Sequence, residues 1–348
     1  MTAVLAREAF GAEFVGADRF LNTPTYGLPP QFLVDALQDC IAEWQAGTME
    51  ATAFDEPVRA ARAGYAALTG VPVGSVAMGG TVSAVLGLVA AAIPDGSRVA
   101  TPSGEFTSTT FPFAAQARRG VTVTELSADE LVATAADYDV VAASLVQSAD
   151  GAVLDMDALR ASVAGNDTLT VIDITQAVGW KRVDLPWVDV TAAAVYKWLL
   201  APRGTAWMSL SDTVARIMTP HAANWYAGEE PWSTIYGLPL RLARDARRFD
   251  ASPSWFSVLG SGLTLPWLAS LDGAAVETHA LGLANRLRAE LQLPQQDSAI
   301  VSIPITDASA KLHRAGIRAS IRAGAVRVGF HLYNTENDLD RLVEALKD

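Results

Sequence analysis

Two stretches of the sequence decide the fold: VIDITQAVG at residues 171–179 and VYKWLLAPRG at residues 195–204. In the first, Asp173 ends a short apolar run, the position at which open α/β sheets carry ligand-binding groups. In the second, Lys197 follows another such run and has apolar neighbours. Burial disfavours the charged ammonium, so a lysine in these surroundings suits Schiff-base chemistry. Taken singly, Asp173 could also be a helix cap and Lys197 a solvated surface group.

Around these stretches, short β-branched runs alternate with helical or turn-rich segments. We predict helices over 31–48, 56–69 and 82–93, and strands near 76–78, 98–100, 121–123, 140–144, 169–172 and 188–195. This alternation predicts an α/β fold, with a parallel sheet covered by helices on both faces.

Beyond residue 250 the pattern changes. It predicts one long helix near 256–291, a strand at 299–305, a helix near 307–315, a strand pair around 317–330 and a final helix at 336–347. We therefore expect a large α/β domain at 21–250 and a small α+β domain at 251–348, with residues 1–20 as a candidate addition to the small domain.

Composition narrows the function classes. The 348 residues are 50% hydrophobic, and 38 acidic against 26 basic side chains give a net charge of −12 with no basic block, which disfavours nucleic-acid binding. The longest apolar run, Val82 to Ile93, falls short of the roughly 20 residues of a membrane-spanning helix, so no membrane insertion is expected. A single cysteine, Cys40, and an N-terminus without a secretory signal predict a cytoplasmic protein. The four scattered histidines lack metal-ligand spacing, so no metal site is expected.

The order of motifs resembles that of class V aminotransferases. A glycine turn at 79–81 is followed by Asp-x-x-Gln-Ala at 173–177 and by Lys197 about two dozen residues later. The resemblance runs from about Leu21-Asn22 to the C-terminus. It implies a fold type I architecture, in which a mostly parallel central sheet is flanked by helices and followed by a smaller α+β domain. It also implies pyridoxal 5′-phosphate as cofactor, an amino acid as substrate, and a homodimer with the active site at the interface.

The resemblance assigns cofactor roles by position. Lys197 would form the internal aldimine and then act as the base that moves the substrate's α-proton, while Asp173 would pair with the pyridinium nitrogen. Gln176 would hydrogen-bond the phenolic oxygen of the cofactor. Phe106 falls where the family places the ring that stacks on the pyridine; the alternative for Phe106 is a core side chain.

The phosphate would bind at Gly80-Thr81-Val82, which opens a helix with free backbone N–H groups. Two positions depart from the family: Val82 replaces a residue that is often Thr or Glu, and Ala194 replaces a phosphate-binding Ser. Ser252, in a segment that resembles one reaching the phosphate across the dimer interface in relatives, is a candidate for compensation.

Substrate contacts are predicted at four positions. Arg327, in the segment 326–336 that matches the family's Arg-x-Ser-x-x-x-Tyr-Asn-Thr signature, would bind the α-carboxylate, and Asn22 opens the region of resemblance. Trp225 and Tyr226 lie in the aromatic segment NWYAGEEPW at 224–232, which we expect at the substrate pocket or the dimer rim. The alternative for this segment is ordinary loop packing. Arg203, Arg318 and Arg322 are further candidates for contacts, or solvated side chains.

The predicted reaction is amino-group transfer. The alternative is a carbon–sulfur or carbon–carbon lyase, similar to selenocysteine lyase, hercynylcysteine sulfoxide lyase or kynureninase, that works without a catalytic cysteine. Residues 319–326 hold no thiol and Cys40 lies in an expected core helix, which argues against a persulfide-forming desulfurase. A third reading, suggested by Val82 and Ala194, is a non-catalytic binding protein.

Overall fold

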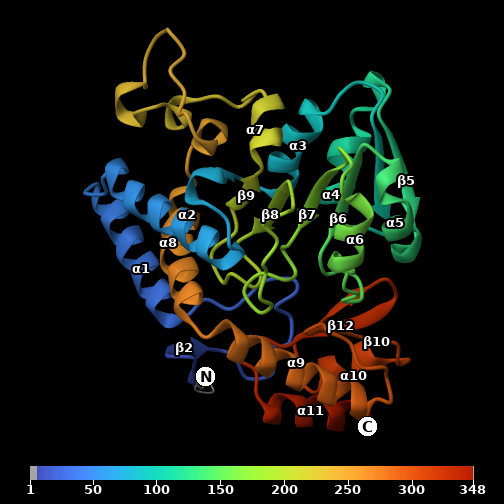
Figure 1. Ribbon diagram of the computed structural model, residues 1–348. Coiled ribbons are helices and arrows are strands. Elements are labelled where there is room, and N and C mark those ends of the chain that lie inside the picture. Colours follow the sequence, from blue (N-terminus) through green and yellow to red (C-terminus); the bar gives the residue numbers. More distant parts are fainter. Residues whose placement is uncertain (1–5, 348) are drawn as a thin grey trace.

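The computed structural model describes residues 6–347, and a sheet of seven strands lies at its centre (Figure 1). Its order is β3-β9-β8-β7-β6-β4-β5. Every neighbouring pair among β4 to β8 is parallel, and only β9 runs antiparallel to its neighbours β3 and β8. The strands are β3 (Val76–Gly79), β4 (Arg98–Pro102), β5 (Thr122–Leu126), β6 (Val140–Ser144), β7 (Leu169–Asp173), β8 (Val190–Ala194) and β9 (Ala206–Leu210). The predicted α/β class is confirmed, whereas β9 was not foreseen.

Helices cover both faces of this sheet because alternate side chains of the strands point to opposite sides. Ile172 of β7 packs into one apolar cluster and Val171 into another. The first cluster includes side chains of α2 (Asp55–Thr69), α5 (Ala128–Thr134), α6 (Met156–Val163) and α8 (Trp255–Ser270), and α1 (Gln31–Ala46) lies against α8. The second includes those of α3 (Val82–Ala92), α4 (Thr107–Ala114) and α7 (Asp212–Ile217). In the described part of the chain, no helix is long and apolar enough to cross a membrane.

A smaller layer of sheet and helices lies below the central sheet in Figure 1. Its antiparallel strands are β10 (Ile300–Ile303), β12 (Ala325–Gly329) and β11 (Ser320–Arg322), in that order, and its helices are α9 (Gly273–Glu290), α10 (Ala308–Arg314) and α11 (Glu336–Lys347). The hairpin of β1 (Ala6–Ala9) and β2 (Ala12–Val15) lies beside them, and Arg7 forms an ion pair with Asp338 of α11 at 2.5 Å. The predicted domain limits stay a prediction.

The expected single helix over 256–291 is wrong, because the chain breaks between α8 and α9. Asp272 accepts hydrogen bonds from the backbone N–H groups of Ala274 and Ala275 and so caps a new helix. The break lets α8 pack along α2 beside the central sheet, while α9 continues into the smaller layer.

Candidate functional site

A pocket opens where β7 and β8 end, at the edge of the sheet where parallel strands bring their carboxyl ends together. Asp173 is the last residue of β7, and Lys197 follows β8 by three residues. Both side chains are buried. The residues lining the pocket are Gly80, Thr81, Val82, Ser83, Phe106, Ser108, Asp173, Thr175, Ala194, Tyr196, Lys197, Arg203 and Thr205.

The Lys197 amine is the reactive group that this geometry favours. Its pKa is lowered from 10.5 to about 8: burial is the main cause, the charge of Asp173 opposes it, and the positive charges of Arg327, Arg322 and Arg203 add to it. The amine therefore has a substantial unprotonated fraction near neutral pH. The centroid of the Phe106 ring lies 5.3 Å from Lys197 Nζ, so this ring lies over the lysine amine. Stacking of Phe106 on the pyridine stays a prediction.

Asp173 presents a buried carboxylate to the same pocket. Its Oδ1 accepts a hydrogen bond from the backbone N–H of Thr175 at 2.8 Å, and its Oδ2 accepts one from the Thr109 hydroxyl at 3.4 Å. Burial raises the pKa of Asp173, and the Thr175 bonds, the Lys197 charge and the Thr109 bond oppose that rise. Within residues 6–347 no cationic side chain lies within ion-pair distance of this carboxylate, which leaves it able to pair with a positively charged ring nitrogen.

The start of α3 forms the opposite wall. The Thr81 hydroxyl caps the helix by accepting from the backbone N–H of Ala84 at 3.1 Å. The N–H groups of Val82 and Ser83 belong to the first turn and have no helical acceptor, so they point to the region where an anion is stabilised. Arg203 lies on the same wall, 5.1 Å from the centroid of the Tyr196 ring, and forms no hydrogen bond or ion pair with the described part of the chain.

Arg327 of β12 lies beside this pocket without lining it. Its guanidinium is buried, with Nη1 donating to the carbonyl and hydroxyl oxygens of Ser148 and Nη2 donating to the Thr25 hydroxyl. Its Nε–H is buried without a partner, and no carboxylate of residues 6–347 lies within ion-pair distance of it. Burial and the nearby charge of Arg322 lower the pKa of Arg327 to about 10. An anion would stabilise this buried cation, and a carboxylate fits the geometry of a guanidinium.

Gln176 does not line the pocket, and its bond to the phenolic oxygen of the cofactor stays a prediction. Its amide nitrogen donates to the Pro24 carbonyl at 3.0 Å and to the Ser148 hydroxyl at 3.1 Å, and its amide oxygen accepts from the Trp198 indole at 2.7 Å. Both amide hydrogens are thus bound to protein atoms, so this side chain has no donor left for a cofactor oxygen. The Gln176 amide thus binds the hydroxyl of Ser148, which also accepts a hydrogen bond from Arg327.

Four further predicted residues lie outside the pocket lining. Asn22 forms a backbone bridge with Gly329, and its side-chain oxygen is buried without a partner. The Tyr226 hydroxyl donates to Asp55 at the start of α2, and Trp225 packs against Tyr226. Their place at the substrate pocket or the dimer rim stays a prediction. Ser252 is exposed, and its predicted role across a dimer interface stays a prediction.

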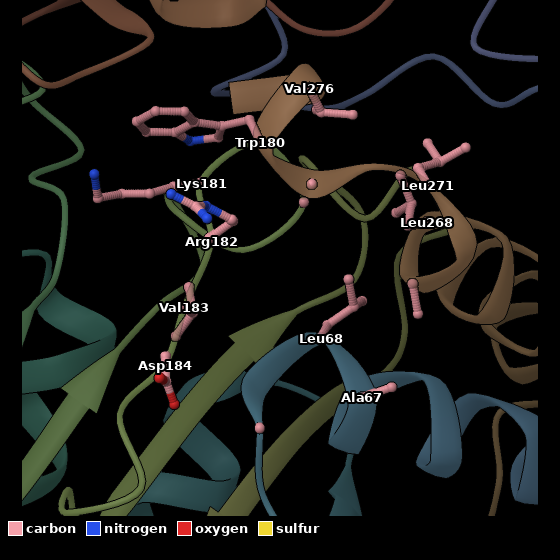
Figure 2. A pocket seen from close by; sticks show the side chains of 14 residues that line it. Ala67, Leu68, Trp180, Lys181, Arg182, Val183, Asp184, Leu268, Leu271 and Val276 are labelled. Carbon is pink, nitrogen blue, oxygen red and sulfur yellow. The ribbon is translucent and has the colours of Figure 1, made fainter. Parts of the chain in front are cut away.

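A separate cavity of about 330 Å³ lies between α2, residues 179–184 and the junction of α8 with α9 (Figure 2). It shares no lining residue with the Lys197 pocket. Lys181 and Arg182 border it, but both form ion pairs with Glu277. Because these charges are already neutralised, the cavity offers no comparable reactive group.

Comparison with known proteins identifies the family. The family model described as aminotransferase class-V matches residues 54–302, which is more than half of the chain. The chain belongs to the class-V aminotransferase family. The predicted membership, the pyridoxal 5′-phosphate cofactor and the prediction of an enzyme that depends on it are thereby confirmed at the level of the family.

Individual members of the class-V aminotransferase family are more distant. The uncharacterized aminotransferase YcbU of Bacillus subtilis (strain 168) is 26% identical over 57% of this chain and 56% of its own length. The isopenicillin N epimerase of Amycolatopsis lactamdurans is 28% identical over 59% of this chain and 58% of its own length. The match thus spans little more than half the length of these curated relatives.

Solved structures confirm the fold. A complex of the cystine C-S lyase C-DES with cysteine persulfide superposes with a TM-score of 0.82 at 17% identity, covering 95% of this chain and 97% of that chain. The apo cysteine desulfurase of Thermococcus onnurineus NA1 gives a TM-score of 0.80 at 17% identity, covering 94% and 93%. At this identity the likeness concerns the arrangement of elements, which is the predicted fold type I architecture.

The chemistry of the pocket fits pyridoxal phosphate. A buried carboxylate without a cation, Asp173, suits a protonated pyridine nitrogen, and Lys197 suits an aldehyde carbon. The unused N–H groups at the start of α3, together with the unpaired Arg203, suit a phosphate. The residues present therefore satisfy each charged end of the cofactor.

Several residues of the site escaped the sequence analysis. Ser148 and Thr25 accept hydrogen bonds from Arg327, Thr109 donates one to Asp173, and Glu105 accepts one from the backbone N–H of Phe106. Hydroxyl residues are common in turns, so nothing in their local sequence separates them from ordinary turn residues.

Proposed function

We propose that the protein acts on an α-amino acid, with transfer of the amino group to a 2-oxo acid as its reaction. The observation that carries the proposal is that the buried side chains of Asp173 and Lys197 line one pocket, with the buried guanidinium of Arg327 near enough for its charge to lower the pKa of Lys197. When bound, pyridoxal phosphate supplies an aldehyde and an electron sink that stabilises negative charge at the substrate's Cα.

Each of the three groups has a separate task in this proposal. Arg327 binds the α-carboxylate of the substrate through the donor that it does not use within the protein, and Thr25 and Ser148 fix its orientation. Lys197 Nζ accepts the proton from Cα and returns it, which requires a pKa not far above neutral. Asp173 keeps negative charge beside the ring nitrogen, and the Phe106 ring excludes water from one side of the lysine.

The choice among reactions rests on the surroundings of the pocket. Cys40 is a buried residue of α1 with its sulfur 4.0 Å from that of Met49, and it is not among the pocket-lining residues. This supports a reaction without an enzyme-bound persulfide. The second candidate is epimerisation at Cα, which the similarity to isopenicillin N epimerase favours.

The experiment is a screen of amino acids with the cofactor-loaded protein, with and without 2-oxo acids. Transfer predicts that, beyond one equivalent of the cofactor-loaded protein, the amino acid becomes a 2-oxo acid only when an acceptor is present. Inversion of configuration at Cα without an acceptor would establish epimerisation instead, and repeated release of pyruvate or alanine from another amino acid without an acceptor would establish a lyase. No change in cofactor absorbance with any amino acid, with Lys197→Ala as the matched control, would overturn the proposal.

A homodimer is part of the proposed function. The segment after α7 projects from the body of the molecule (Figure 1), and Tyr236 and Leu238 in it are 88% and 90% exposed. Large apolar side chains that are this exposed favour contact with a partner protein that would bury them. The family resemblance implies that this partner is a second copy of the chain. Light scattering should therefore give twice the mass of the chain; a monomer at micromolar concentration would contradict it. A cytoplasmic location stays a prediction.

A further inference from the structure

Glu105 is a buried carboxylate that the proposed chemistry does not use. Only 6% of its surface is exposed, and no lysine or arginine of residues 6–347 lies within ion-pair distance of it. Its Oε1 accepts hydrogen bonds from the backbone N–H of Phe106 and from the Ser144 hydroxyl, both at 2.6 Å. Its Oε2 accepts from the backbone N–H of Ser144 and from the Gln147 amide, both at 2.7 Å.

These four bonds suit the ionised carboxylate. Three of the four donors are N–H groups, which cannot accept, so both oxygens of Glu105 have to be acceptors. Burial raises the pKa of Glu105, and the bonds from Ser144, Phe106 and Gln147 oppose that rise. The Glu105 carboxylate therefore connects the start of α4 to residues 144–147 through hydrogen bonds on both sides.

Both segments that Glu105 connects lead to residues of the proposed reaction site. On one side, Phe106 follows Glu105 directly and places its ring 5.3 Å from Lys197 Nζ. On the other side, the segment that begins at Ser144 continues to Ser148, which receives the hydrogen bonds of Arg327 and Gln176. The same short segment, residues 144–148, thus connects the residue that covers the lysine with the residue that holds the carboxylate-binding arginine.

We propose that Glu105 is a positioning residue: its carboxylate fixes residues 144–148 against the start of α4 and thereby holds the Phe106 ring over the Lys197 amine. The inference rests on the proposed function only in treating Lys197 as the reacting group. Glu105 itself is buried and does not line the pocket.

Glu105→Gln tests this with little change of volume. If the new amide nitrogen takes the Oε1 position it faces the N–H of Phe106, and if it takes the Oε2 position it faces the N–H of Ser144. In either arrangement a backbone N–H loses its acceptor, so the connection between residues 144–148 and the start of α4 becomes weaker. A displaced ring no longer covers or stabilises the Lys197 ammonium, so the amine becomes more reactive.

The readout is reductive methylation of Lys197 in the apoprotein at about pH 7, measured by peptide mass spectrometry with exposed Lys347 as the internal reference. We expect Glu105→Gln to speed modification about threefold, the change expected for loss of a cation–π contact. In a Phe106→Leu background the same substitution should have no further effect. Glu130→Gln removes an exposed carboxylate that is also hydrogen-bonded, in the cap of α5 outside the pocket, and should leave the rate unchanged.

An unchanged rate in Glu105→Gln, or an equal increase with and without the Phe106 ring, would overturn the proposal. If Glu105→Gln fails to fold, Ser144→Ala removes only the hydroxyl bond and should give a smaller increase of the same sign, again abolished by Phe106→Leu; no increase would count against the proposal. Because the assay uses neither cofactor nor substrate, a failure of the proposed amino-acid reaction does not affect its result.

Discussion

The pH dependence of the Lys197 amine offers a direct test of the electrostatics of the pocket. Burial together with Arg327, Arg322 and Arg203 lowers its pKa to about 8 from 10.5. At about pH 7.5, a pKa of about 8 leaves roughly 24% of the amine unprotonated, against roughly 0.1% for a pKa of 10.5, so the reactive fraction differs roughly 240-fold. Reductive methylation of the apoprotein across pH should show a midpoint near 8 for this residue.

Asp173→Asn should move that midpoint further down. The Asp173 charge favours the ammonium, so its removal lowers the pKa of Lys197. Asparagine fits the site, since its amide oxygen can still accept from the Thr175 N–H and its amide nitrogen can donate to the Thr109 hydroxyl. Arg203→Gln removes a positive charge that disfavours the ammonium and should move the midpoint up.

The opposite signs of these two shifts make the reasoning refutable. The accessibility of Lys197 to the reagent does not affect the comparison, because each midpoint is taken from the shape of the pH profile of this one residue. A wild-type midpoint near 10.5, an upward shift in Asp173→Asn, or shifts of the same sign in both variants would show that burial and these charges do not control the amine.

Two further predictions concern the cofactor phosphate and stability. Arg203→Gln should weaken apoprotein binding of pyridoxal phosphate about tenfold, by loss of a charge-assisted contact, and leave binding of pyridoxal unchanged in a fluorescence titration; equal losses for both ligands would remove Arg203 from the phosphate site. Asp250→Asn should lower the free energy of unfolding by about 3–5 kcal/mol in urea, because it leaves Arg62 buried without its carboxylate. Glu56→Gln, in an exposed ion pair, should cost less than about 1 kcal/mol, and similar losses for both variants would contradict the role of burial.

The sequence predicted those parts of the site that depend on short-range pattern. Apolar β-branched runs fixed the strands that end near Asp173 and Lys197, and parallel neighbours bring such ends to one edge. The helix start after Gly80-Thr81 was equally local, since it depends on a capping hydroxyl three residues from its donor. Motif order supplied the family, which the comparisons confirmed.

The sequence pattern did not predict contacts between segments that are distant along the chain. The Thr25 hydroxyl that holds Arg327 is 302 residues away along the chain, and the Tyr226 hydroxyl that turns to Asp55 is 171 residues away. Gln176 had the expected residue type, yet its amide hydrogens bind Pro24 and Ser148. Residue type determines what a side chain can bind. The pattern of apolar and polar residues determines which strand or helix carries that side chain. Which partner it meets is decided only when packing brings separate segments together, because a hydrogen bond forms within a few tenths of an ångström and pattern does not specify such distances.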